Sequence, residues 1–336
     1  MTTTPPSAPV AAGSPALDSL EGLALGDAFG ERWFPRFHGG QHMAAAALRE
    51  RRTPEGPVPW RWTDDTALAL ALFGVVRSTG AVHQELLAEA FGVIYLDDQY
   101  RGYGYGMHQL LPRLAERPDR WRAEARAMFD GRGSLGNGAA MRVAPLGAWF
   151  HDDVEEAAEQ AVLSAEVTHT HPEAVAGAVA VAVAAALFAA SRGRAAPEPS
   201  RLLAEVVERT PDGAVRDGLL EAARLPAGTS AADAAEILGS GEKISAADTV
   251  PFAVWSATRH ADDLTEALWH TAEGFGDVDT TCAVVGGIVA ARTGVGDAPA
   301  DWRGRREPLP AWVYEGDEER ADGAAEADRN GKGRTS

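Results

Sequence analysis

Cysteine is almost missing from this sequence. Cys282 is the single cysteine in 336 residues, so the chain cannot build an internal disulfide framework. This composition fits a reducing compartment, and we expect a cytoplasmic protein. Because Cys282 opens an apolar run directly after an acidic cluster, we predict a buried core residue and not a nucleophile.

Basic side chains are also scarce. Lys and Arg number 31 against 49 Asp and Glu, which gives a formal net charge of −18. Such a surface repels nucleic acids and anionic membranes, so we expect neither as a partner. An anionic ligand must therefore be bound by a local arrangement of donors.

Long hydrophobic runs are limited to one stretch, 174–191 (AVAGAVAVAVAAALFAAS). It is long enough to cross a bilayer. However, it is mostly alanine, which is weakly apolar, so we predict a central helix packed on all sides. Residues 1–15 lack the basic and apolar regions of a secretory signal and are predicted to form a disordered tail.

The alternating pattern of β-strands is absent as well. From about Leu17 to Arg292, apolar residues recur at spacings of three and four between short Gly, Pro and Asp breaks. This pattern predicts an all-α fold in one domain, residues 16–300. Residues 301–336 are charged and poor in apolar side chains, so we expect a flexible acidic tail. We expect a monomer.

Two acidic clusters, far apart in the sequence, share one layout. Thr63-Asp64-Asp65-Thr66 precedes the apolar run 67–76, and Asp277-Val278-Asp279-Thr280-Thr281 precedes the apolar run 282–291. Each pattern predicts the N-terminus of a buried helix. Taken alone, the first cluster is explained by capping of the third helical amide by Thr63 and by two carboxylates near the positive end of the helix dipole.

The repetition indicates more than capping. If the two helix starts meet, four carboxylates and up to two threonine hydroxyls surround one point, which is unstable without cations. We interpret Asp277 and Asp279 as an extended lead-in that turns both carboxylates to one side, with the Thr280 hydroxyl beside them. Oxygen ligands without His or Cys favour Mg²⁺, Mn²⁺ or Ca²⁺ over zinc or copper. The sequence therefore predicts a site for hard divalent cations.

A third segment, 131–142 (GRGSLGNGAAMR), is rich in glycine. Glycines let the backbone approach a ligand closely and leave amide groups free, an arrangement suited to a diphosphate. The segment matches neither the P-loop nor the dinucleotide-binding fingerprint. A tight turn between helices is the simpler alternative.

A fourth segment, Thr168-His169-Thr170-His171-Pro172, opens the alanine-rich helix, with Pro172 suited to the first helical position. Either histidine is explained as a cap or as the filling of a turn. In the alternative interpretation, His169 donates a hydrogen bond to a sugar hydroxyl or a phosphate.

Together these motifs resemble the ADP-ribosylglycohydrolase family, the group that includes dinitrogenase reductase activating glycohydrolase. The five matching segments, in order, are Gly22 to Gly30, Trp62 to Thr66, Gly133 to Arg142, Thr168 to Pro172 and Gly276 to Thr281. The resemblance implies an orthogonal bundle of α-helices with a two-metal site, for Mg²⁺ or Mn²⁺, in a cleft.

The resemblance also implies roles for individual residues. The implied metal ligands are Thr63, Asp64, Asp65, Asp277, Asp279 and Thr280. The residues implied around the diphosphate and adjoining ribose are Gly133, Ser134, Gly136 and Asn137, with His169 nearby. Phe129 occupies the position of an adenine-stacking aromatic, and Asp27 that of a group supporting the metals.

One departure from the family concerns a flap over the metals. Many relatives carry a glutamate four residues beyond the last glycine of the first motif, where this chain has Phe34. Glu31 is a possible substitute for that flap residue. Its alternative interpretation is a solvated residue at the end of a helix.

The implied function is hydrolysis of the glycosidic bond between ADP-ribose and an acceptor, such as a modified protein side chain or a small-molecule conjugate. Metals would orient the terminal ribose and a water molecule, and Asp65 or Asp279 would accept the proton of that water. Two alternatives stay open: a relative that binds ADP-ribose without turnover, and a metal-dependent phosphatase or nucleotide hydrolase.

Overall fold

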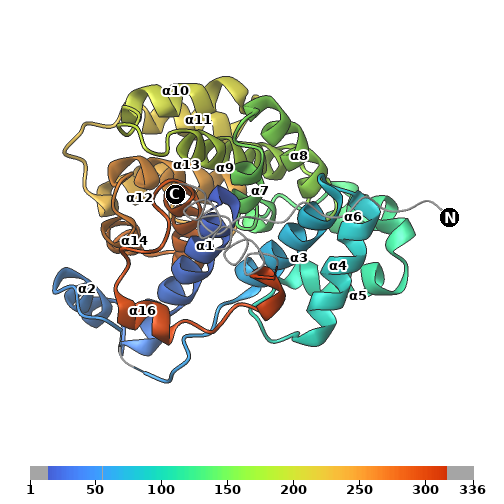
Figure 1. Cartoon of the computed structure of the whole chain (residues 1–336), viewed down its shortest axis with the longest axis horizontal. Helices are drawn as coiled ribbons and strands as arrows, with labels where there is room; N and C mark the ends of the chain where they lie inside the picture. Colours follow the sequence, from blue (N-terminus) through green and yellow to red (C-terminus); the bar gives the residue numbers. More distant parts are fainter. Residues whose placement is uncertain (1–13, 55, 316–336) are drawn as a thin grey trace, which may run out of the picture.

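The computed structural model describes residues 14–54 and 56–315 (Figure 1). In these ranges the chain is helical, with an isolated bridge between Trp60 and Arg306 and no sheet, so the predicted all-α class is confirmed. The helices are α1 (Pro15–Glu31), α2 (Gln41–Arg49), α3 (Asp64–Thr79), α4 (Gln84–Asp97), α5 (Tyr105–Glu116), α6 (Trp121–Gly131), α7 (Ala144–Trp149), α8 (Val154–Glu166), α9 (Pro172–Ala190), α10 (Pro199–Arg209), α11 (Ala214–Ala222), α12 (Ala231–Leu238), α13 (Ala246–Arg259), α14 (Leu264–Ala272), α15 (Val278–Thr293) and α16 (Ala300–Arg305).

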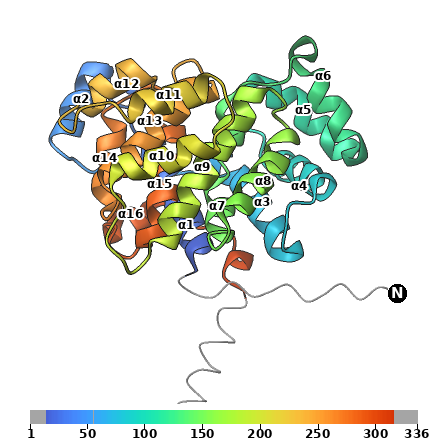
Figure 2. The same cartoon turned by 90° about the horizontal axis from the view of Figure 1, so that it is seen from above.

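The centre of the bundle is formed by α1, α9, α13 and α15. Helix α15 packs against the other three and against α14. In both views, α3, α4, α5 and α6 lie together on one side of this centre, while α12 and α14 lie on the other (Figures 1 and 2). The site described below is lined by residues from α3 and α5 on one side and from α15 on the other.

The alanine-rich stretch is helix α9. Pro172 occupies its first turn, and the His171 side chain accepts a hydrogen bond from the Glu173 amide at 3.2 Å. The helix is apolar enough to cross a membrane, and 78% of its most apolar window is buried inside the protein. It contacts α7, α8, α10, α11, α13 and α15. The prediction of a central packed helix is confirmed.

Helices α1 and α15 approach unusually closely, and glycine permits it. Along one face of α1, an added Cβ at Gly22 would lie 2.4 Å from the Gly286 carbonyl oxygen, and one at Gly26 would lie 2.0 Å from the Cys282 carbonyl oxygen. At Gly30 an added Cβ would lie 2.6 Å from the Asp279 Cα. Since real side chains cannot occupy such distances, these three glycines seat α15 against α1.

Cys282 lies in this contact and is fully buried. Burial raises the pKa of its thiol well above the ordinary value. A buried thiol without an activating cation is unreactive, so the prediction of a core residue is confirmed.

The predicted C-terminal tail begins too early. Residues 301–315 are ordered against the bundle: Trp302 is buried, its ring stacks on Phe29 at 4.5 Å between centroids, and Val313 is buried as well. Glu307 forms a two-point ion pair with Arg101 at 2.7 and 2.9 Å. The low apolar content of this segment concealed a few large side chains that bury much surface each. The rest of the predicted tail, 316–336, lies outside the described residues.

At the other end, α1 begins at Pro15, and the Ser14 side chain accepts a hydrogen bond from the Leu17 amide at 3.2 Å. The ordered body therefore starts slightly before residue 16. Residues 1–13 of the predicted N-terminal tail lie outside the described residues.

The glycine contact predicts the stability of two matched variants. Gly26→Ala places a methyl group against the α15 backbone and should lower the free energy of unfolding by about 1–3 kcal/mol, the usual cost of overpacking. Gly304→Ala, also in a helix but with nothing within 4 Å of the added methyl, should be neutral or stabilising by up to about 1 kcal/mol. Urea unfolding measures both; equal midpoints would contradict the tight α1–α15 contact.

Candidate active site

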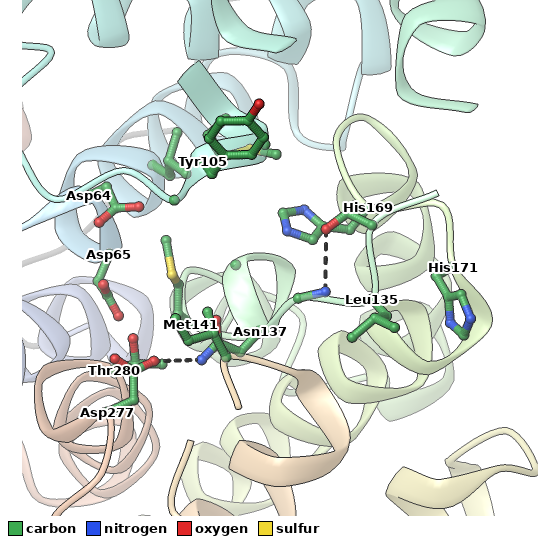
Figure 3. A pocket seen from close by; sticks show the side chains of 18 of the residues that line it. Asp64, Asp65, Tyr105, Leu135, Asn137, Met141, His169, His171, Asp277 and Thr280 are labelled. Carbon is green, nitrogen blue, oxygen red and sulfur yellow. Dashed lines mark hydrogen bonds between the residues drawn. The ribbon is translucent and has the colours of Figure 1, made fainter. Parts of the chain in front are cut away.

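A cavity of about 550 Å³ opens where the predicted motifs meet (Figure 3). Its lining residues are Asp64, Asp65, Leu68, Gly102, Gly104, Tyr105, Gly106, Met107, Phe129, Arg132, Gly133, Ser134, Leu135, Gly136, Asn137, Gly138, Met141, His169, His171, Ile244, Asp277, Asp279 and Thr280. The two acidic helix starts, the glycine loop and the histidine segment therefore share one cavity. Thr63 and Glu31 are outside this lining.

The start of α3 is held by α1. Asp27 is fully buried, and its carboxylate accepts hydrogen bonds from the Thr63 amide at 2.9 Å and from the Thr66 amide at 3.1 Å. Thr63 does precede the first helical residue, but its hydroxyl makes no capping bond within α3. It lies 2.9 Å from Asp27 Oδ1 and 3.0 Å from Asp65 Oδ2 instead. The interpretation of Thr63 as a side-chain cap is therefore wrong, because Asp27 satisfies these amides from another helix.

The start of α15 differs from the expected extended lead-in. The helix begins at Val278, so Asp277 is the residue before it and Asp279 already lies in its first turn. Asp277 is held from the glycine loop, because Asn137 Nδ2 donates to its Oδ2 at 2.7 Å. Figure 3 shows Asp277 and Thr280 on the side of the cavity that faces Asp64 and Asp65.

The four cluster carboxylates repel one another, with Asp64 and Asp65 buried and Asp277 and Asp279 partly buried. Burial first, and then the neighbouring charge of Asp27, raises the pKa of Asp64 to about 8. The same causes raise the pKa of Asp65 well above its ordinary value, and burial with the charge of Asp277 does so for Asp279. Burial also raises the pKa of Asp277. Charges that oppose one another this strongly are the normal setting of a cation site or of an acid–base site.

The donor set fits hard divalent cations. Asp65 Oδ1 is buried and has no hydrogen-bond partner among the described residues, which is costly unless something else satisfies it. Within 14–54 and 56–315, no group of three or more Asp, Glu, His or Cys side chains is close enough to hold an ion by itself. A complete set of ligands would therefore need threonine hydroxyls, water or substrate oxygens beside the carboxylates.

The glycine loop forms the wall beside Asn137. Gly133 has a positive φ of 74°, and the space beside it is filled by Thr170 and His171 of the next segment. The Leu135 and Asn137 amides donate no hydrogen bond to any described residue. Free amides next to a short helical turn suit an anionic oxygen.

Two aromatic side chains stand at the rim. Phe129 has a positive φ of 53° and is 45% exposed. The resemblance to the family was the basis for expecting this residue at the site. Tyr105, at the start of α5, is 78% exposed and was not predicted from the sequence. The alternating Gly and Tyr of 102–106 were the available signal, because such a run lets the backbone bend while presenting aromatic rings.

His169 is buried and His171 is not, which separates their roles. His171 caps α9, as one interpretation of the sequence had it. His169 lines the cavity, and burial together with the charge of Arg142 lowers its pKa to about 3. It is therefore a neutral imidazole at all ordinary pH values.

Glu31 ends α1 and pairs with Arg36 at 2.7 Å. Its side chain is 22% exposed, so it is not the freely solvated residue of one interpretation. Burial raises its pKa, and the charge of Asp277 adds to that rise. Its role as a flap stays a prediction.

An all-α fold that brings acidic helix starts and a glycine-rich loop to one cavity is the arrangement that the resemblance predicts. A family model described as ADP-ribosylglycohydrolase matches residues 11–332. The chain therefore belongs to the ADP-ribosylglycohydrolase family, a family of hydrolases.

Individual relatives agree. The chain is 31% identical over 272 residues to ADP-ribosylhydrolase ARH3 of Homo sapiens, covering 72% of this chain and 73% of that protein. It is 32% identical over 234 residues to an uncharacterized protein of Archaeoglobus fulgidus, covering 69% and 71%. A solved structure, an ADP-ribosylglycohydrolase-related protein complex, matches with a TM-score of 0.58 at 24% identity over 91% of this chain and 95% of that one, which shows a shared fold.

The carboxylate cluster predicts how stability depends on pH without metal. The pKa of Asp64 rises on folding from 3.8 to about 8, so the folded chain binds this proton more tightly than the unfolded chain does. The stabilisation that the protonated Asp64 carboxyl gives to the folded chain is complete below the unfolded pKa of 3.8. It is lost as the pH rises through the folded pKa of about 8. We expect the free energy of unfolding, measured in chelator, to fall over this window by up to about 1.4 kcal/mol per pH unit for this group.

Asp64→Asn cannot ionise and serves as the control. Its stability should depend less steeply on pH than that of the unsubstituted chain, measured by urea unfolding at a series of pH values. Equal slopes for the two proteins would contradict the buried, repelling arrangement of Asp64.

Proposed function

We propose that this protein is a metal-dependent ADP-ribosylglycohydrolase that releases ADP-ribose from an ADP-ribosylated side chain or a small-molecule conjugate. The observation that carries the proposal is the meeting of the Asp64-Asp65 and Asp277-Asp279 clusters in one cavity with a glycine-rich loop. Family membership and the ADP-ribosylhydrolase relatives support the same chemistry.

Two divalent cations, Mg²⁺ or Mn²⁺, are proposed as cofactors. The residues that would hold them are Thr63, Asp64, Asp65, Asp277, Asp279 and Thr280. Such cations would neutralise the buried carboxylates and fix oxygen groups of the terminal ribose in place. The partnerless Asp65 Oδ1 supports this assignment.

The side chains of the cavity divide the remaining tasks. Asp27 holds the start of α3 by accepting hydrogen bonds from the Thr63 and Thr66 amides. Asn137, in the glycine loop, holds Asp277 by donating a hydrogen bond to its carboxylate. Hydrolysis at the anomeric carbon passes through a state with oxocarbenium character, and a carboxylate must take the proton of the attacking water. We assign that role to Asp65 or Asp279, which line the cavity and whose pKa values burial and neighbouring carboxylates raise well above the ordinary value.

The ADP half of the ligand would occupy the rest of the cavity. Gly133, Ser134, Gly136 and Asn137 face the diphosphate and its ribose, and Phe129 stacks on the adenine. The acidic cluster and the aromatic rim line a single cavity, which supports this placement. We further propose a cytoplasmic monomer that acts on ADP-ribosylated substrates and not on membranes or nucleic acids, in keeping with its strong negative charge.

The first test is product release from defined substrates. With Mg²⁺ or Mn²⁺, incubation with ADP-ribosylated arginine or ADP-ribosylated serine should release free ADP-ribose, and chelator should abolish the release. Asp65→Asn and Asp279→Asn should each lower kcat/KM by about 100-fold or more. Asp212→Asn, an exposed acid with a side chain 92% accessible, is the matched control and should keep full activity.

The products separate the alternatives. Release of AMP or phosphate would replace the glycohydrolase with a phosphatase or nucleotide hydrolase. Thermal stabilisation by ADP-ribose without any product would identify a binding protein. Near-normal turnover by both carboxylate variants would refute the proposed metal ligands.

The second test addresses adenine recognition. Phe129→Ala should weaken ADP-ribose binding by about 1–3 kcal/mol, the typical loss of one base–aromatic stack. Tyr100→Ala, which removes an aromatic ring that is 91% exposed and lies outside the cavity lining, should leave binding unchanged. Titration calorimetry measures both, and equal affinities of the two variants would remove Phe129 from the adenine site.

A further inference from the structure

Arg142 is buried, and within the described part of the chain its guanidinium has no carboxylate partner. Its guanidinium donates to the carbonyl oxygens of Gly138 and Ser164, each at 2.9 Å, and to the Thr168 hydroxyl oxygen at 3.0 Å. It also lies 4.4 Å from the centroid of the Phe91 ring. No acid contributes to its pKa, which burial alone lowers to about 9. A guanidinium held this way can only donate, so every oxygen around it must accept.

This constraint fixes the proton of the Thr168 hydroxyl. Thr168 is fully buried, and its oxygen has two partners among the described residues: Arg142, and His169 Nδ1 at 2.7 Å. Since Arg142 donates to the oxygen, the hydroxyl proton has one acceptor left, which is Nδ1. If Nδ1 carried a proton itself, the buried hydroxyl would have no acceptor.

The other ring nitrogen of His169 faces the ligand cavity. Nε2 has no hydrogen-bond partner in the part of the chain that the structure describes, although the side chain is only 3% exposed. The neighbouring loop makes room for the ring: an added Cβ at Gly138 would lie 3.0 Å from Nε2, and one at Gly136 would lie 3.4 Å from it. Figure 3 shows the ring directed into the cavity, between Tyr105 and Asn137.

We infer that Arg142 and Thr168 are positioning residues that hold His169 as the Nε2–H tautomer, so that it donates a hydrogen bond to an acceptor oxygen of the bound ligand. The ligand half of this inference rests on the proposed function. The neutral state of the ring, kept by burial and by the nearby guanidinium, makes His169 a donor whose direction does not change with pH in the ordinary range. An unpaired anionic or hydroxyl oxygen is the acceptor that such a donor recognises.

The tautomer is measured directly in the unliganded full chain. Long-range ¹H–¹⁵N correlation on protein labelled with ¹⁵N-histidine distinguishes a protonated ring nitrogen from an unprotonated one. The chain has nine histidines, and the signals that vanish in His169→Gln assign this ring. We expect Nε2 to be protonated and Nδ1 to be unprotonated. The reverse pattern, or a doubly protonated ring near neutral pH, would overturn the inference.

A pair of Thr168 variants tests the positioning role. Thr168→Val keeps the side-chain shape but removes the hydroxyl, so the His169 nitrogen signals should shift toward a mixture of tautomers. The Kd for ADP-ribose should then rise about three- to tenfold, as for the loss of one neutral hydrogen bond. Thr168→Ser keeps the hydroxyl and should retain both the signals and the affinity. Equal affinities of the Val and Ser variants would overturn the inference.

Two further arms keep the outcomes distinct. If Thr168→Val weakens ADP as much as ADP-ribose, the acceptor oxygen belongs to the ADP half; if only ADP-ribose is weakened, it belongs to the terminal ribose. Should the unsubstituted protein neither bind ADP-ribose nor release it, the proposed function fails, while the spectrum of the unliganded chain still decides the tautomer. That spectrum needs no substitution at Thr168, so a variant that misfolds does not remove the test.

Discussion

The close contact between α1 and α15 is the constraint on which the site depends. Glycines on one face of α1 bring the backbone of α15 to within the space of a missing side chain. From another face of α1, Asp27 reaches the first amides of α3. One helix therefore sets the positions of both acidic helix starts, and a change in its distance from α15 would alter the distance between the two clusters.

The site concentrates charge at a cost to the folded state. Five acids have raised pKa values: Asp27, Asp64 and Asp65, which are buried, and Asp277 and Asp279, which are partly buried. Around them the protein supplies amides, hydroxyls and one Asn side chain. Among the described residues, no Arg or Lys lines this end of the cavity, and Arg132 in the glycine loop is the one Arg or Lys in its lining. A protein cation there would neutralise the cluster permanently. Without a protein cation, the negative charge of the carboxylates remains for a ligand to neutralise. The folded protein thereby loses stability and gains a binding site, as is common at functional sites.

Motifs and helical periodicity predicted the all-α class, the central helix and several of the residues that line the cavity, although Tyr105 was missed and Thr63 and Glu31 lie outside the lining. The patterns predicted these features because caps, glycines and apolar spacing are local properties of the sequence. The contacts between distant residues were not predictable in this way. Asp27 caps a helix other than its own, Asn137 holds Asp277 across 140 positions, and the polar surroundings of Glu307 hid its pairing with Arg101. Thr63 looked like a cap because the sequence shows the hydroxyl but not the competing carboxylate.

The strap formed by 301–315 bears on the site through one arginine. Glu307 forms an ion pair with the Arg101 guanidinium, which also lies 3.6 Å from the centroid of the Trp62 ring. The Arg101 carbonyl oxygen accepts a hydrogen bond from the Asp64 amide at 2.8 Å. A protein shortened at the boundary that composition suggests would lose this anchor and uncover the rings of Trp60 and Phe29. The strap is thus joined through Arg101 to the start of α3, so its removal would disturb the position of Asp64.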